Sequence, residues 1–239
     1  MLADGGARLV LWDIDNTVLT IGPVSRELYA TAFLQVTGEP MTTWTGGAGL
    51  TERAIVLNTL RAHDLPCDEA TISAFYQALG RAADRMVDRM REVGRRLPGA
   101  ARAVADLAEQ GAVQSVVTGN LRSVAARKLE AFGLTERLDL EIGAFGDEGT
   151  RRCELVRNAV RRAGRAHGVR LTGDRVVVIG DTLHDVRGAQ DAGTRAVGVA
   201  TGPCPLGDLA AAGADAVLED LRDLPALRAA VFVGAPAAG

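Results

Sequence analysis

Residues 9–17 read LVLWDIDNT, in which four apolar residues are followed at once by two aspartates two positions apart. A short apolar run without alternation is typical of a parallel strand buried on both faces. If the chain turns after this strand, the Asp13 carboxylate can attack an electrophile while Asp15 gives and takes protons. Taken alone, such a pair is more often a solvated acidic turn.

The same pattern recurs along the chain. Further short apolar runs occupy residues 115–117, 176–179, 196–199 and 216–218, and helical patterns occupy residues 100–110, 121–132, 153–167 and 185–192. This alternation predicts an α/β fold with a doubly wound parallel sheet. Ligands bind such sheets at the carboxyl ends of the strands, which is where Asp13, Thr118 and Asp181 fall.

One long stretch breaks the alternation. Helical patterns cover residues 26–36, 51–63 and 68–92, and no confident strand occurs between residues 22 and 96. Pro98-Gly99 then marks the return to strand–helix order. We therefore predict a core domain formed by residues 1–20 and 97–239, with residues 21–96 inserted as an all-helical cap over the site.

A second acidic group follows the apolar run at residues 176–179. Asp181 would lie beside Asp13 if their strands are neighbours. Two carboxylates, a phosphate oxygen, a backbone carbonyl and waters make a suitable octahedral magnesium site. Such a metal also removes the repulsion between an anionic nucleophile and an anionic phosphate. Asp185 opens a predicted helix and could instead be its N-cap.

Residues 118–120, Thr-Gly-Asn, follow the run at 115–117. A hydroxyl and exposed amides at the start of a helix can hold a phosphate oxygen. In isolation, these residues are equally well an ordinary strand–helix turn. The prediction of a site therefore depends on the three groups together, since each lies at the carboxyl end of a predicted strand of one sheet.

In order, spacing and strand context, these motifs resemble those of the haloacid dehalogenase (HAD) superfamily, in its phosphoglycolate-phosphatase-like branch with a helical cap. Residues 13–17 resemble the family's DxDxT motif, residues 117–120 its Ser/Thr motif, and residues 180–185 its GDxxxD motif. The resemblance covers nearly the whole chain, including the helical insert. It implies a Rossmann-like core and hydrolysis or transfer of phosphate esters, with Mg²⁺ as cofactor.

The resemblance also implies roles for the acidic residues. Asp13 would be the nucleophile and a magnesium ligand. Asp15 would be the acid–base residue and would give its backbone carbonyl to the metal. Asp181 would bind the metal directly, and Asp185 would support it through water or hydrogen bonds.

For the phosphoryl group, the resemblance implies Thr118 as the residue that binds it during transfer. Thr17, Gly119 and Asn120 complete the predicted phosphate-binding set. Asp15 narrows the chemistry further, because family members that cleave carbon–halogen bonds usually lack this second aspartate.

The chain departs from the family at one motif, which is usually a lysine about thirty residues before GDxxxD. Residues 151–155 read RRCEL and contain no lysine. Arg152 lies 29 residues before Asp181, and its guanidinium could supply the charge with a forked geometry. The rival is Lys128, the chain's only lysine, which lies too early for the motif. We favour Arg152, and the alternative is that Arg151 and Arg152 both lie on the surface.

The predicted cap contains a Gly-rich segment, residues 42–53, which reads TTWTGGAGLTER. A turn of this kind before a helix could reach the site and select the substrate. Arg53 could pair with a carboxylate or a second phosphate, and Trp44 could stack on the substrate. The alternative is a loop between helices with a packed tryptophan.

Composition limits the partners. The net charge is −3, the pI is about 5.7, and 24% of the residues are charged, so nothing favours nucleic acid or an anionic membrane. No apolar run approaches the roughly 18–20 residues of a membrane span, and residues 1–8 do not resemble a secretion signal. The three cysteines are widely spaced and indicate neither zinc nor disulfides. We expect a cytoplasmic monomer or homodimer.

These observations predict a Mg²⁺-dependent phosphatase that hydrolyses a small phosphorylated metabolite, phosphoglycolate-like or a sugar phosphate, through an aspartyl phosphate. One alternative is a sugar-phosphate mutase, which would return the phosphoryl group to a substrate. Another is a HAD protein that binds a phosphorylated ligand without turnover.

Overall fold

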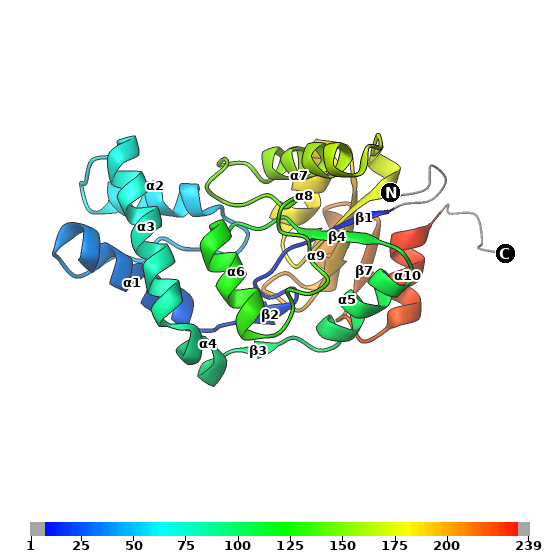
Figure 1. Cartoon of the computed structure of the whole chain (residues 1–239), viewed down its shortest axis with the longest axis horizontal. Helices are drawn as coiled ribbons and strands as arrows, with labels where there is room; N and C mark the ends of the chain where they lie inside the picture. The colour runs from blue at the N-terminus through cyan, green and yellow to red at the C-terminus, as the bar shows by residue number, and fades with distance from the viewer. Residues whose placement is uncertain (1–7, 234–239) are drawn as a thin grey trace.

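The structure is a computed structural model and describes residues 8–233. Its centre is a sheet of five parallel strands in the order β4-β1-β5-β6-β7 (Figure 1). The strands span Val113–Val116 (β4), Leu9–Trp12 (β1), Val176–Gly180 (β5), Arg195–Val199 (β6) and Ala216–Leu218 (β7). Each of the five apolar runs contributes one strand, which confirms the predicted α/β class.

Helices cover both faces of this sheet. Successive side chains of a strand point to opposite faces, so a strand that is apolar throughout needs packing partners on both. In β1, Val10 and Trp12 belong to one core cluster, and Leu9 and Leu11 belong to another. The first cluster includes residues of α5 (Ala100–Glu109), α6 (Arg122–Ala131) and α10 (Leu224–Phe232). The second includes residues of α7 (Arg152–His167), α8 (Leu183–Ala192) and α9 (Leu206–Ala211).

The predicted helical insert lies between two short strands. β2 (Leu19–Thr20) pairs in antiparallel fashion with β3 (Arg95–Arg96). Between them come α1 (Val24–Thr37), α2 (Glu52–Ala62), α3 (Glu69–Arg85) and α4 (Val87–Val93). Figure 1 shows these helices to one side of the sheet, next to α6.

Two details of the insert differ from the sequence prediction. The helix expected at residues 68–92 is divided at Met86, which ends α3 and precedes α4. The strand β3 lies in a stretch for which we predicted none, because its two exposed arginines form no apolar run. Its extended backbone depends on pairing with β2, an interaction between residues far apart in the chain.

Strand order places the ends of β4, β1 and β5 side by side. Trp12, the last residue of β1, is in register with Val116 on one side and Ile179 on the other. The Asp13 amide then donates to the Ile179 carbonyl at 2.8 Å. The carboxyl edge of the sheet therefore brings together the three segments that carry the motifs, as the strand-end argument predicts.

Candidate active site

A tight turn after β1 arranges the first two aspartates. Asn16 has a φ of 61°, a left-handed conformation that asparagine tolerates better than most residues. Its amide donates to the Leu19 carbonyl at 2.8 Å, and its carbonyl accepts from the Thr201 hydroxyl at 2.6 Å. The turn leaves Asp13 buried and Asp15 half-buried, and both line one cavity.

Three buried carboxylates gather at this edge of the sheet. Asp13, Asp181 and Asp185 each offer an oxygen, and these oxygens all lie within 4.8 Å of one another. The Thr17 hydroxyl donates to Asp181 Oδ1 at 2.9 Å. Asp185 Oδ2 accepts from the hydroxyl and amide of Thr182 in a capping box, so Thr182 is the N-cap of α8. Asp185 therefore stabilises the start of α8 through one oxygen and also contributes an oxygen to the acidic cluster.

The electrostatics of the cluster fit a hard divalent cation. Burial raises the pKa of Asp13 well above its ordinary value, and burial together with Asp185 raises the pKa of Asp181 to about 7. Asp181 Oδ2 and Asp185 Oδ1 are buried and accept no hydrogen bond. Buried carboxylate oxygens without donors are suitable ligands for Mg²⁺, which binds oxygen in octahedral geometry.

Arg152 is the positive charge beside the predicted nucleophile. It begins α7, and its Nη1 lies 3.4 Å from Asp13 Oδ1 and donates to the Val117 carbonyl at 3.2 Å. Its Nη2 lies 3.0 Å from Asp185 Oδ1, without hydrogen-bond alignment. Burial lowers the pKa of Arg152, but the surrounding carboxylates outweigh burial and raise it. Arg151, by contrast, is exposed.

Gly188 in α8 makes room for Arg152. A Cβ at this position would lie 2.5 Å from Arg152 Cγ and 2.8 Å from its Cβ, much closer than carbon atoms can approach. A glycine inside a helix is unfavourable by about 1 kcal/mol relative to alanine. Gly188 is therefore unfavourable for the helix itself, and packing against Arg152 accounts for its presence.

Gly188→Ala should lower kcat by roughly tenfold to a hundredfold, because small displacements of charged groups at a reacting centre have effects of this size. The matched control is Gly207→Ala in α9, where an added Cβ meets nothing within 4 Å. The control should keep its kcat and unfold at an equal or higher temperature. Full activity of Gly188→Ala would show that Arg152 does not need this position.

Lys128, which the sequence analysis ranked below Arg152, also lies in the site. It is buried, and its Nζ is 2.8 Å from Asp15 Oδ1, 2.7 Å from Asp15 Oδ2 and 2.6 Å from Asn120 Oδ1. The family's motif spacing favours Arg152, because Lys128 lies too early in the chain for the motif. The available signal was a lysine on the same helix face as the apolar residues Val124 and Ala125.

Thr118 and Asn120 form the opposite side of the site. Thr118 Oγ1 accepts from the backbone amide and the side-chain amide of Asn120, at 3.3 and 2.7 Å. Its own proton therefore stays available for an acceptor in the cavity. The Asn120 side chain also donates to Asp15 Oδ2 at 2.8 Å, which ties the two predicted motifs together.

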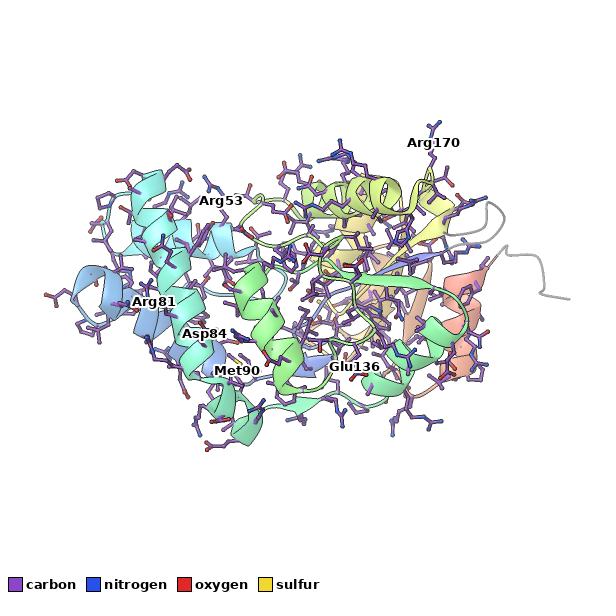
Figure 2. All side chains as sticks on the ribbon, in the orientation of Figure 1. Arg53, Arg81, Asp84, Met90, Glu136 and Arg170 are labelled. Carbon is purple, nitrogen blue, oxygen red and sulfur yellow. The ribbon has the colours of Figure 1, made fainter. Side chains whose placement is uncertain are left out.

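Two residues predicted to bind phosphate or substrate have other partners. Thr17 is fully buried and donates to Asp181, so it supports a predicted metal ligand. Arg53 is at the edge of the molecule (Figure 2), where it forms an ion pair with Glu69. Glu52 is the first residue of α2 and lines the cavity, whereas its neighbour Arg53 does not.

The cavity has a volume of about 360 Å³ and lies between the strand ends and the helical insert. Gly119 contacts the insert directly, since a Cβ there would lie 2.1 Å from the Leu50 carbonyl oxygen. The Glu52 amide donates to the Gly119 carbonyl at 2.7 Å, and the Arg53 amide donates to that of Gly146 at 3.0 Å. These contacts hold residues 46–50 of the Gly-rich segment at the cavity wall.

The fold and the site define an α/β enzyme with an acidic centre at the carboxyl edge of its sheet. The sequence model of the haloacid dehalogenase-like hydrolases matches residues 10–190, and the chain belongs to this family. The resemblance stated from the motifs is thereby confirmed. Among curated proteins, none matches the chain.

Solved structures show the same fold. A hydrolase from Pseudomonas syringae is 21% identical with a TM-score of 0.66, over 91% of this chain and 96% of that one. CbbY from Rhodobacter sphaeroides, solved in complex with phosphate, is 20% identical with a TM-score of 0.65, over 91% and 96%. A putative β-phosphoglucomutase from Thermotoga maritima is 20% identical with a TM-score of 0.60, over 92% and 98%. At these identities the likeness concerns the fold.

In the described part of the chain, every helix is too short or too polar to cross a membrane.

Proposed function

We propose that the protein is a Mg²⁺-dependent phosphatase that hydrolyses small phosphate monoesters through an aspartyl phosphate on Asp13. The observation that carries the proposal is the position of the Asp13 carboxylate. It lies directly after β1, beside Arg152 and two further carboxylates, and opens into a cavity shared with Asp15 and Thr118.

In the first half-reaction, an oxygen of Asp13 attacks phosphorus and the bond to the leaving oxygen breaks. Asp15 donates a proton to that oxygen, and an alcohol leaves. Arg152 offsets the charge that Asp13 and the phosphoryl oxygens bring together, and the Thr118 hydroxyl donates to one of those oxygens. Lys128 donates to both oxygens of the Asp15 carboxylate and Asn120 donates to one of them, which holds the carboxylate in position.

In the second half-reaction, Asp15 accepts a proton from water as the water oxygen attacks phosphorus. The bond to Asp13 breaks, inorganic phosphate leaves, and Asp13 is regenerated as a carboxylate. Asp13, Asp181 and Asp185 would hold the metal, with the backbone carbonyl of Asp15. The cation would neutralise phosphoryl charge and stabilise the transition state electrostatically.

We further propose that residues 21–96 act as the cap and residues 1–20 and 97–239 as the core. Residues 1–7 and 234–239 of this division lie outside the described residues. The β2–β3 pair is the double connection between the two parts. The hydrogen bonds from the start of α2 to Gly119 and Gly146 support a cap that packs over the site.

The proposal predicts that phosphate release from 4-nitrophenyl phosphate requires Mg²⁺. EDTA should abolish the release, and excess Mg²⁺ should restore it. Mg²⁺ without substrate should also raise the unfolding temperature, since a ligand at 100 times its Kd adds about 2.7 kcal/mol to the stability of the folded state. If Mg²⁺ supports no phosphate release and causes no rise in the unfolding temperature, the proposal is refuted.

A mutase remains the alternative, because one of the similar structures is described as a putative β-phosphoglucomutase. The two activities differ in their products. A phosphatase releases one inorganic phosphate for each ester consumed, whereas a mutase conserves the ester. Measuring phosphate and total ester after reaction with a sugar phosphate decides between them.

A further inference from the structure

Part of the cavity wall outside the acidic cluster is apolar. Its side chains come from the insert and from α6: Leu28, Tyr29, Trp44, Ile55, Leu79 and Val124. The rings of Tyr29 and Trp44 lie edge to face, with centroids 4.8 Å apart, an arrangement that favours a rigid wall. The part of a substrate beyond its phosphoryl group would lie against this surface.

The positive charges that line the cavity already have partners. Among the described lining residues, the cations are Lys128 and Arg152. Lys128 has three protons to donate and three acceptor oxygens within 2.8 Å, on Asp15 and Asn120. Arg152 lies between Asp13, Asp185 and the Val117 carbonyl. Neither side chain is placed to pair with a second anionic group on a substrate.

Glu52 adds a negative charge at the insert end of the cavity. It is buried, and it accepts hydrogen bonds from the Tyr29 hydroxyl and from the Leu121 amide, the latter at 3.1 Å. Burial raises the pKa of Glu52, while those hydrogen bonds and Lys128 oppose the effect. A second carboxylate or phosphate on the substrate would therefore be desolvated near a buried acid without a cation to pair with, which is unfavourable.

We infer that the leaving group selected by this cavity is an uncharged alcohol with an apolar face, and that phosphate esters carrying a second anionic group are rejected. The inference rests on the proposed phosphatase function and narrows its substrate class. It departs from the phosphoglycolate-like substrate expected from the sequence. Arg53, which the sequence offered as a partner for a carboxylate or a second phosphate, is paired with Glu69.

Three matched esters test the inference: cyclohexylmethyl phosphate, its trans-4-carboxylate and its trans-4-ammonium derivative. The charge lies far from the scissile bond, so the leaving alcohols have nearly equal basicity. With Mg²⁺ present, we expect the kcat/KM of the neutral ester to exceed that of the carboxylate by at least about a hundredfold, as for sites that leave a polar group unpaired. A charged ester that reacts as well as the neutral one overturns the inference.

Leu50→Lys adds a cation to the wall of the cavity. This variant should shift the ratio of kcat/KM values towards the carboxylated ester by roughly tenfold or more, as one new ion pair in a desolvated site would. The matched control is Leu34→Lys on α1, where the side chain is 52% exposed and outside the cavity. An unchanged ratio in Leu50→Lys would place the substrate elsewhere and overturn the inference.

The generic aryl ester separates this inference from the proposal beneath it. If 4-nitrophenyl phosphate is not hydrolysed with Mg²⁺, both the phosphatase function and the substrate class fail. If it is hydrolysed while the carboxylated ester is preferred over the neutral one, the function stands and only the substrate class is wrong.

Discussion

Asp13→Asn should lower kcat by at least about 10⁴-fold, because loss of a nucleophile removes the covalent route altogether. Asparagine has nearly the same shape as aspartate but cannot form the aspartyl phosphate. The measurement is phosphate release with Mg²⁺ at saturating ester, compared with the wild-type protein. Activity within about tenfold of wild type would mean that another residue attacks phosphorus.

The Asp13→Asn variant should remain folded, because it removes a carboxylate whose charge is disfavoured by burial. The pH dependence of its unfolding temperature tests this explanation. Burial raises the pKa of Asp13, so its contribution to stability is present below the ordinary carboxyl pKa and is lost as the pH rises through the raised value. Without metal at neutral pH, Asp13→Asn should therefore unfold at a temperature equal to or above that of wild type. The difference should shrink towards about pH 4, near the ordinary pKa of aspartate.

Arg152→Ala should lower kcat by about 10³-fold, the upper end of the range for removal of one electrostatic stabiliser. The variant leaves Asp13 and Asp185 without their cation, and Arg152 is nine-tenths or more buried. Breaking a buried ion pair costs about 3–5 kcal/mol of stability, part of which Mg²⁺ should restore. Activity and unfolding temperature are measured with and without the metal.

Lys128→Ala is the comparison that gives this result meaning. Lys128 contacts Asp15 and not Asp13, and Asn120 still holds Asp15 when the lysine is removed. We expect a smaller loss, roughly tenfold to a hundredfold, as for a weakened acid–base group. Arg152→Lys should be more active than Arg152→Ala, because lysine keeps the positive charge. It should be less active than wild type, because a point charge replaces the forked guanidinium. A larger loss in Lys128→Ala than in Arg152→Ala would reverse the roles of the two cations.

The sheet and the meeting of the motifs were predictable because each depends on local pattern. Asp13 and Asp181 follow short apolar runs, and such runs become buried parallel strands whose carboxyl ends share one edge. The family's motif spacing pointed to Arg152, and the structure has Arg152 at the start of α7, beside Asp13. No pair of distant residues had to be known for any of these predictions.

The partners of long side chains were not predictable in the same way. Arg53 and Glu52 are adjacent in sequence, but the helix start at Glu52 places one in the cavity and the other beside Glu69. Likewise, Lys128 and Asp15 are 113 residues apart in the chain, with the helical insert between them. Side-chain direction on a helix follows its rotation against neighbouring elements, which packing decides.

The amino-acid sequence by itself determined the α/β class, the helical insert and the family, because apolar periodicity and motif spacing are local properties. Only the tertiary structure decided which carboxylates each cation contacts, where Arg53 lies and that Glu52 lines the cavity. The physical reason is that these contacts join residues far apart in the chain, so their geometry exists only after the sheet and the insert have packed together.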